Sequence, residues 1–286
     1  MIKIFTDTSA NLPAELIKKH GLTVVGFSYS VNGVEVKEDP EADFDGKTFY
    51  DAMREGAQVK TAMVNIGTFT EAMDAELSAG NDIIYIGMSG GISGTAHAAR
   101  VAAEDLSEIY PERRIAVIDT LAASLGEGLQ VLEAAEMLEA GASFDGIVDT
   151  VNKKRLTMCQ YFTVDDLEYL KRGGRISRVA SVVGTVLRIK PLLTGNDEGK
   201  IVLCGKARGR RQSLMDLAER YDALVRHKDE RIGIAHADDE AGAAILLGLL
   251  RSKGFTGECI TVCYEPVTGA HVGPGTVALF FRGIHK

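Results

Sequence analysis

The residues best suited to chemistry lie in segment 87–100, which reads GMSGGISGTAHAAR and follows an apolar run. Its glycines allow a ligand to approach the backbone, and the small residues after them are typical of a helix start. The first N–H groups of a helix have no partner within it, and the helix dipole adds partial positive charge there. Ser93 adds a hydroxyl where the helix is predicted to begin. The segment therefore predicts an anion site, although a simple N-cap at Ser93 in a glycine turn would also explain it.

The same segment has an enzymatic interpretation. Residues 87–91 match G-x-S-x-G, the nucleophile elbow of α/β-hydrolases, with Ser89 at the position of the nucleophile. An acidic residue and His271 follow in the chain order that such enzymes use. Patterns of three small residues arise easily between a strand and a helix, so a serine esterase using the GMSGG elbow is kept as an alternative hypothesis.

Further polar candidates lie elsewhere in the chain. His271 is expected in a tight, irregular loop, EPVTGAHVGPG, where an imidazole could bond a carboxylate or simply be satisfied by backbone carbonyls. Thr61 in VKTAMVN is expected on a connection between helices. Two basic clusters, KRGGRIS with Arg175 and GKARGRR with Arg208, could steer an acidic partner, although most charge runs are solvated faces.

These residues need a scaffold, and the order of strand and helix signals predicts one. The signals alternate over residues 1–155, which is typical of a parallel sheet with helices on both faces, while Asn32-Gly33 predicts a small hairpin. From residue 156 the strands come closer together, with a hairpin turn at 196–199, which indicates a mixed α/β fold. We therefore expect two α/β domains, residues 1–155 and 156–286, with a cleft between them as the natural ligand site.

Composition excludes several classes of protein. The 286 residues are 45% hydrophobic and 25% charged, which is typical of a globular protein, and the net charge of −8 argues against nucleic-acid binding. No apolar run reaches the ~20 residues that span a bilayer, and a charged strand, MIKIFTD, opens the chain in place of a signal peptide. We expect no integral membrane segment and a cytoplasmic location. Four scattered cysteines and six histidines without ligand spacing predict no metal or cofactor.

Seven motifs, in order over nearly the whole chain, make the sequence resemble the DegV family. They are TDTSANLP, VKT, SGGISGT, VIDTLAASLGEG, FTVDDLEYLKRGGRIS, RIKPLL followed by GKI, and GAHVGPGTVALFF. The resemblance implies two α/β domains that hold a long-chain fatty acid, with its tail in an apolar tunnel and its carboxyl near the domain interface. It also implies a separate fatty acid kinase subunit that phosphorylates the bound carboxylate. The acyl phosphate would then serve phospholipid synthesis, so the chain is expected to be a carrier and not an enzyme.

The resemblance also implies site residues. The carboxylate contacts would fall on Thr61, Ser93, Gly94 and His271, and Arg175 and Arg208 match basic positions near the tunnel mouth or the docked partner. The family often reads K-T-S-Q where this chain has Lys60-Thr61-Ala62-Met63, so a hydroxyl and an amide beside the expected carboxyl are replaced. A binding module for another lipid remains a further alternative.

Overall fold

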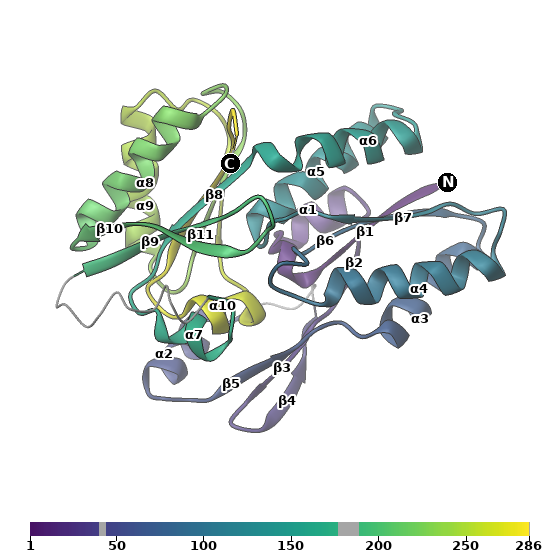
Figure 1. The fold of residues 1–286 in the computed structure, drawn as a ribbon, viewed down its shortest axis with the longest axis horizontal. Coiled ribbons are helices and arrows are strands. Elements are labelled where there is room, and N and C mark those ends of the chain that lie inside the picture. The colour runs from purple at the N-terminus through teal and green to yellow at the C-terminus, as the bar shows by residue number, and fades with distance from the viewer. Residues whose placement is uncertain (40–43, 177–188, 286) are drawn as a thin grey trace. The chain divides into compact units, whose positions relative to one another are not determined.

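The structure is a computed structural model that describes residues 1–39, 44–176 and 189–285. Its backbone contacts divide the chain into two compact units (Figure 1). The first contains Met1–Asp43 and Lys60–Arg155, and the second contains Phe44–Val59 and Leu156–Lys286. The predicted boundary after residue 155 places residues 44–59 in the N-terminal domain, whereas the backbone contacts group them with the second unit. Each unit is an α/β fold of its own.

The first unit is built on a four-stranded sheet in the order β2-β1-β6-β7, and all of its strand pairs are parallel. Helices α5 and α6 cover one face of this sheet, and α3 and α4 cover the other (Figure 1). The predicted parallel sheet with helices on both faces is therefore confirmed. The bounds are β1 Ile2–Asp7, β2 Thr23–Val25, β6 Asp82–Gly87, β7 Ile115–Asp119, α1 Ala14–Lys19, α3 Ile66–Ser78, α4 Thr95–Ile109, α5 Leu125–Glu139 and α6 Phe144–Lys154, with the 3-10 helices η1 Thr8–Ala10 and η2 Arg155–Thr157.

Apolar side chains fill both faces of this sheet. Strand β6 reads DIIYIG and is buried along nearly its whole length, as expected for a parallel strand between two helical layers. On one face Ile84 and Ile86 pack with Val131 of α5 and Ile147 of α6. On the other face the ring of Tyr85 meets that of Phe69 edge to face, with centroids 5.0 Å apart. The carboxyl ends of β1, β6 and β7 are thereby fixed side by side.

A small second sheet contains the predicted hairpin. Its order is β4-β3-β5, with β3 Ser28–Val31, β4 Val34–Lys37 and β5 Val59–Ala62. Asn32 and Gly33 both have positive φ, as a two-residue hairpin turn requires, so that prediction is confirmed. Thr61 lies between two helices, as predicted, but the short VKTA run around it forms β5 at the edge of this sheet.

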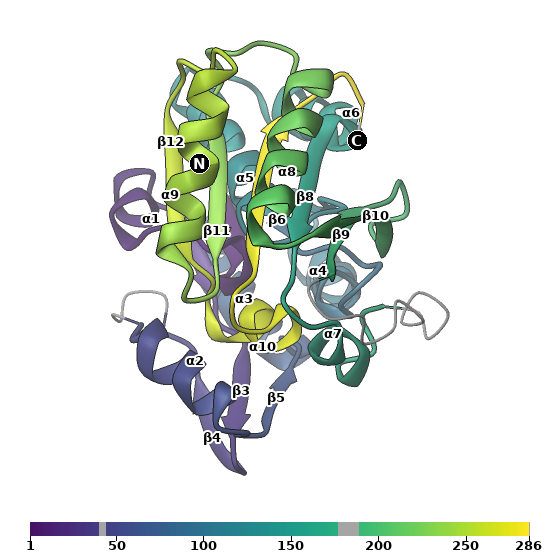
Figure 2. The same cartoon turned by 90° about the vertical axis from the view of Figure 1, so that its left-hand side faces the viewer.

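The second unit is built on a six-stranded sheet in the order β10-β9-β8-β13-β11-β12. Strands β11 and β12 pair in parallel and the other neighbours pair antiparallel, which confirms the predicted mixed sheet and the hairpin at 196–199. Helices α8 and α9 lie side by side on one face (Figure 2). Arg188, the first residue of the RIKPLL motif, lies outside the described residues. The bounds are β8 Met158–Thr163, β9 Ile189–Gly195, β10 Ile201–Arg208, β11 Ile232–His236, β12 Cys259–Cys263, β13 Val277–Arg282, α8 Arg210–Leu224 and α9 Glu240–Ser252.

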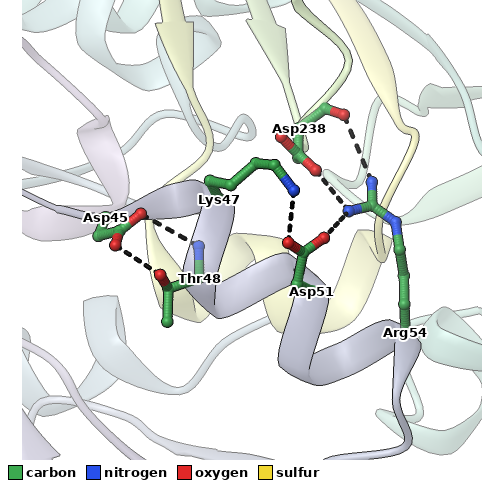
Figure 3. Close-up of polar contacts among 6 residues, drawn as sticks. All are labelled: Asp45, Lys47, Thr48, Asp51, Arg54 and Asp238. Atoms are coloured by element: carbon green, nitrogen blue, oxygen red, sulfur yellow. Dashed lines mark hydrogen bonds and ion pairs between the residues drawn. The ribbon is translucent and has the colours of Figure 1, made fainter.

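Among the described residues of the second unit there are also three short helices: α2 Gly46–Arg54, α7 Glu168–Arg172 and α10 Pro266–Val272. The phenol of Tyr50 on α2 is fully buried and donates to the carbonyl of Tyr264 at 2.9 Å. Arg54 at the end of α2 bonds both Asp51 and Asp238, the latter in the loop after β11 (Figure 3). These contacts explain why residues 44–59 belong to the second unit and not to the first.

Within the part of the chain that the structure describes, no helix is both long and apolar enough to cross a bilayer.

Candidate functional site

The glycine-rich segment joins the end of β6 to the start of α4. Helix α4 begins at Thr95, two residues later than predicted, and Gly94 is its N-cap without any side-chain capping bond. The hydroxyl of Ser93 lies 2.8 Å from that of Thr95 and accepts the Thr95 N–H at 3.3 Å. Ser93 is half-buried and Gly94 is exposed. A hydroxyl, an exposed glycine and the positive end of a 15-residue helix therefore meet at one point, which suits an anion.

Hydrogen bonds to the end of β7 and to the segment after it hold this loop in place. The Ser89 N–H donates to the Ala122 carbonyl at 2.8 Å, and the Gly90 N–H donates to the Asp119 carboxylate at 3.0 Å. Within that supporting segment Leu121 and Ser124 adopt positive φ, a conformation that costs side-chain-bearing residues energy. Such strained backbone often occurs beside functional sites, where the surrounding structure enforces it.

Ser89 has the features of a turn residue. Its side chain is fully buried, its hydroxyl accepts the Gly91 N–H at 3.1 Å, and its φ is not positive. A nucleophile elbow instead exposes its serine on a strained turn that leads directly into the helix, whereas α4 begins six residues after Ser89. The local geometry therefore does not favour the esterase alternative.

The segment that carries Thr61 approaches the same helix start. Thr61 is half-buried in β5, and Met63 follows directly after that strand. The Met63 sulfur lies so close to Gly94 that a Cβ added to this glycine would be 2.6 Å from it. Met63 thus covers the N-cap of α4 with a flexible thioether. The first unit therefore brings the segment of Thr61 together with Ser93 and Gly94.

His271 lies in helix α10, so the predicted irregular loop is wrong at this position. The Glu265 carboxylate caps α10 by accepting the N–H groups of Val267 and Thr268, and Pro266 fits the first turn. Gly273, with φ of +80°, ends the helix two residues after His271. The sequence signal for this helix was the run Glu-Pro-Val-Thr, in which an N-cap acid precedes proline.

The imidazole of His271 is packed on the end of α7. A Cβ added to Gly173 would lie 2.1 Å from His271 Nδ1, so only glycine allows this approach. Burial, reinforced by the positive charge of Arg175, lowers the pKa of His271 to about 4. Arg175 is half-buried and donates to the Gly173 carbonyl at 2.5 Å. The second unit therefore places a neutral imidazole beside a guanidinium, a pair that suits a carboxylate or a phosphate.

Arg208 is exposed at the last position of β10, directly before the turn into α8. Its side chain is available to a partner in solution, unlike that of Arg175. In the described ranges, no group of three His, Cys, Asp or Glu side chains is arranged to hold a metal ion.

Sequence reasoning assigned no role to a buried acidic cluster beneath the glycine-rich loop. Asp7 at the end of β1 and Glu127 on α5 are both fully buried, and Ser9 lies between them. The motifs TDTSANLP and VIDTLAASLGEG contained this signal, since each places an acid in an otherwise small or apolar segment.

Comparison with known proteins identifies the family. A family model described as an uncharacterised protein of the DegV family matches residues 1–283. The chain belongs to the DegV family. A DegV domain-containing protein of Clostridium perfringens is 37% identical to it, over 99% of this chain and 98% of the relative. Another from Lactococcus lactis is 33% identical over 97% and 96%. The resemblance found in the sequence is therefore confirmed.

Solved DegV structures match both units. A DegV family protein from Thermus thermophilus, described by its fatty acid binding, is 29% identical with a TM-score of 0.87, and the match covers 99% of each chain. A fatty acid binding DegV family protein from Streptococcus agalactiae is 27% identical with a TM-score of 0.87 over 98% of each chain. DegV of Bacillus subtilis, a fatty acid binding protein, is 28% identical with a TM-score of 0.83 over 98% of each chain.

Proposed function

We propose that this DegV family protein binds one long-chain fatty acid and carries it, without transforming it by itself. The observation that carries the proposal is the match over nearly the whole chain to DegV structures that bind fatty acids. The anion-binding features of the loop before α4 are consistent with a fatty acid carboxylate. The buried turn role of Ser89 agrees with a carrier better than with an esterase.

In this proposal Thr61, Ser93 and Gly94 supply hydroxyls and the start of α4 to the carboxylate. His271 donates a ring N–H to it. Because the pKa of His271 is about 4, the imidazole is neutral at pH 7 and would bind the carboxylate through a hydrogen bond.

The acyl tail would lie in an apolar tunnel and supply most of the affinity. Each buried methylene contributes about 0.8 kcal/mol, so a chain of ~16 carbons contributes at most on the order of 12 kcal/mol before ordering costs. Carboxylate contacts add less energy, but they fix the head group at a defined place. A carrier of this kind releases its ligand slowly.

We further propose that a separate fatty acid kinase in the cytoplasm phosphorylates the carboxylate while the protein holds it. The resulting acyl phosphate, used in phospholipid synthesis, is labile in water and would be protected in a closed apolar site. The sequence contains no G-x-x-x-x-G-K-[ST] motif, which agrees with ATP being supplied by the partner. Arg175 would face the added phosphate, and the exposed Arg208 would contribute to kinase docking.

Mass spectrometry of the purified protein tests the binding proposal. We expect one long-chain fatty acid per chain in the native spectrum and in the solvent extract, and at least about tenfold weaker retention in Ser93→Ala, since a hydrogen bond to a charged group is lost. Ser107→Ala is the matched control, because Ser107 lies on the same helix and donates only to the Ala103 carbonyl. A wild-type protein that stays empty when offered palmitate and oleate contradicts the proposal. Recovery of a different lipid would identify the alternative ligand class.

Charge reversal tests the kinase proposal separately. Arg208→Glu should leave the bound fatty acid in place and slow its phosphorylation by a fatty acid kinase, with a steeper loss at low salt. Unchanged phosphorylation at low salt contradicts the docking role. Ester hydrolysis that disappears in Ser89→Ala would instead support the esterase alternative.

A further inference from the structure

Strand β4 is the last strand of the small sheet in the first unit, and its outer edge is exposed. The order of that sheet is β4-β3-β5, so among the described residues β4 pairs with β3 alone. All four residues of Val34–Lys37 are exposed. Figure 1 shows the hairpin of β3 and β4 extending away from the four-stranded sheet of the same unit. The outer edge of such a strand offers N–H and C=O groups to which another strand can bond.

The pairing with β3 determines which backbone groups of β4 point outward. Strands β3 and β4 pair antiparallel in one continuous register. In such a pair, residues that exchange hydrogen bonds with the neighbouring strand alternate with residues whose N–H and C=O groups point away from it. The Glu38 N–H donates to the Phe27 carbonyl at 2.9 Å, which assigns the even-numbered residues of β4 to the side of β3. The N–H and C=O groups of Glu35 and Lys37 therefore point to the outer edge.

A second copy of β4 fits this edge in one register. A two-fold axis at Val36 places Glu35 of each copy opposite Lys37 of the other copy. Both residues direct their backbone groups outward, so each of these two pairs exchanges two hydrogen bonds, and each pair also joins opposite charges. An axis at Glu35 or at Lys37 would instead oppose two like charges. An axis between two residues would oppose an outward-pointing residue to one that already bonds β3, which loses the hydrogen bonds.

The side chains also match across this axis. Successive residues of a strand alternate between its two faces, so Val34 and Val36 share one face of the sheet, and Glu35 and Lys37 share the other. Val36 lies opposite Tyr29 of β3 and is 38% exposed. A two-fold axis perpendicular to the sheet keeps the valine faces of both copies on the same side. Val36 then meets its equivalent as a non-hydrogen-bonded pair, in which side chains approach most closely, while the charged face stays in water.

We propose that two copies of this chain associate through β4, with Val36 on a two-fold axis, to form one sheet of order β5-β3-β4-β4-β3-β5. So short a pairing buries less than the about 1,200–2,000 Å² of a standard interface, so the dimer is weak and forms at high protein concentration. The charged pairs are exposed, so added salt weakens it further. The proposal is independent of the fatty acid site.

Charge reversal tests the register. Sedimentation velocity of the full chain at low salt should show a dimer fraction that rises with protein concentration. Glu35→Lys and Lys37→Glu each turn two attractive pairs into two repulsive ones and should each weaken association at least about fivefold. The double variant Glu35→Lys/Lys37→Glu restores opposite charges and should associate like wild type. Glu108→Lys is the matched control, because this exposed residue on α4 lies outside the small sheet.

Two results of this experiment would overturn the proposal. One is a wild-type chain that stays monomeric at its highest soluble concentration, which would leave the edge of β4 to a partner of another kind. The other is a double variant that associates no better than the two single variants.

Cysteine cross-linking tests the position of the axis. Cα atoms of a non-hydrogen-bonded pair lie about 4.5 Å apart, within the range that a disulfide spans. Val36→Cys should therefore cross-link two copies when an oxidant is added, as read on a non-reducing gel. Val34→Cys is the control: it is more exposed, at 68%, but its two copies would lie about 13 Å apart. Both variants keep the four native cysteines. Equal cross-linking of the two variants, or none in Val36→Cys, overturns the proposed axis.

Discussion

Gly173→Ala should move the imidazole of His271 out of its buried position. The added methyl would lie 2.1 Å from His271 Nδ1, and ordinary contacts of a Cβ begin near 3.4 Å, so the ring or the end of α7 must shift by at least about 1.3 Å. Gly173 has φ of −70°, so its backbone tolerates alanine and the whole effect comes from the overlap. Such overpacking costs about 1–3 kcal/mol of unfolding free energy.

The decisive measurement is the pKa of His271, followed by NMR through the imidazole C2 proton. In wild type, burial and Arg175 lower this pKa to about 4. A displaced ring regains water, so in Gly173→Ala the pKa should rise toward the ordinary value of about 6.5, and fatty acid retention should fall.

Gly174→Ala is the matched control. Gly174 has φ of +70° and nothing within 4 Å of an added Cβ, so alanine there costs about 1–2 kcal/mol of backbone strain without touching His271. Both variants should lose stability, but only Gly173→Ala should change the pKa of His271. An unchanged pKa in Gly173→Ala, or the same shift in both variants, would refute the reasoning.

Three further predictions follow from the described contacts. His271 binds no proton in the folded protein between its ordinary pKa of about 6.5 and about 4, so the free energy of unfolding should fall as pH is lowered through that window. His271→Gln should flatten this part of a urea-unfolding pH profile. Gly128→Ala should cost about 1–3 kcal/mol, because the new Cβ would lie 2.5 Å from the Ala10 carbonyl; thermal unfolding measures this. Tyr50→Phe removes the buried bond to the Tyr264 carbonyl and should cost about 1–3 kcal/mol, measured by urea unfolding of the second unit's signal.

Much of the fold could be predicted because local signals and burial agree. The apolar strand DIIYIG, the Asn32-Gly33 turn and the helix signals around it define the first unit without long-range information. The membership of α2 in the second unit could not be predicted in this way. It depends on Tyr50, Arg54 and their partners more than a hundred residues later, and sequence patterns do not report such contacts.

The candidate site, like the fold, could be predicted only in part. Ser93 and Gly94 were identified because an anion site at a helix start has a local signature of glycines and a hydroxyl. Asp7 and Glu127 were not identified, because a buried acid becomes unusual only when its environment is known. The helix around His271 was missed because the glycines after it suggested a loop, although Glu265 and Pro266 form an ordinary helix start.

The insertion of α2 into the second unit has a consequence for synthesis on the ribosome. Residues 44–59 leave the ribosome well before the rest of their unit, which begins again at residue 156. The α2 partners Asp238 and Tyr264 lie 184 and 214 residues beyond Arg54 and Tyr50. Translation proceeds at about 5–20 residues per second, so this helix emerges roughly 10–40 s before these partners exist. During that interval the apolar face of α2, including Phe49 and Tyr50, has no native surface to cover it. We therefore expect chaperones to bind residues 44–59 most strongly on ribosome-bound chains that already contain this helix but not yet its partners.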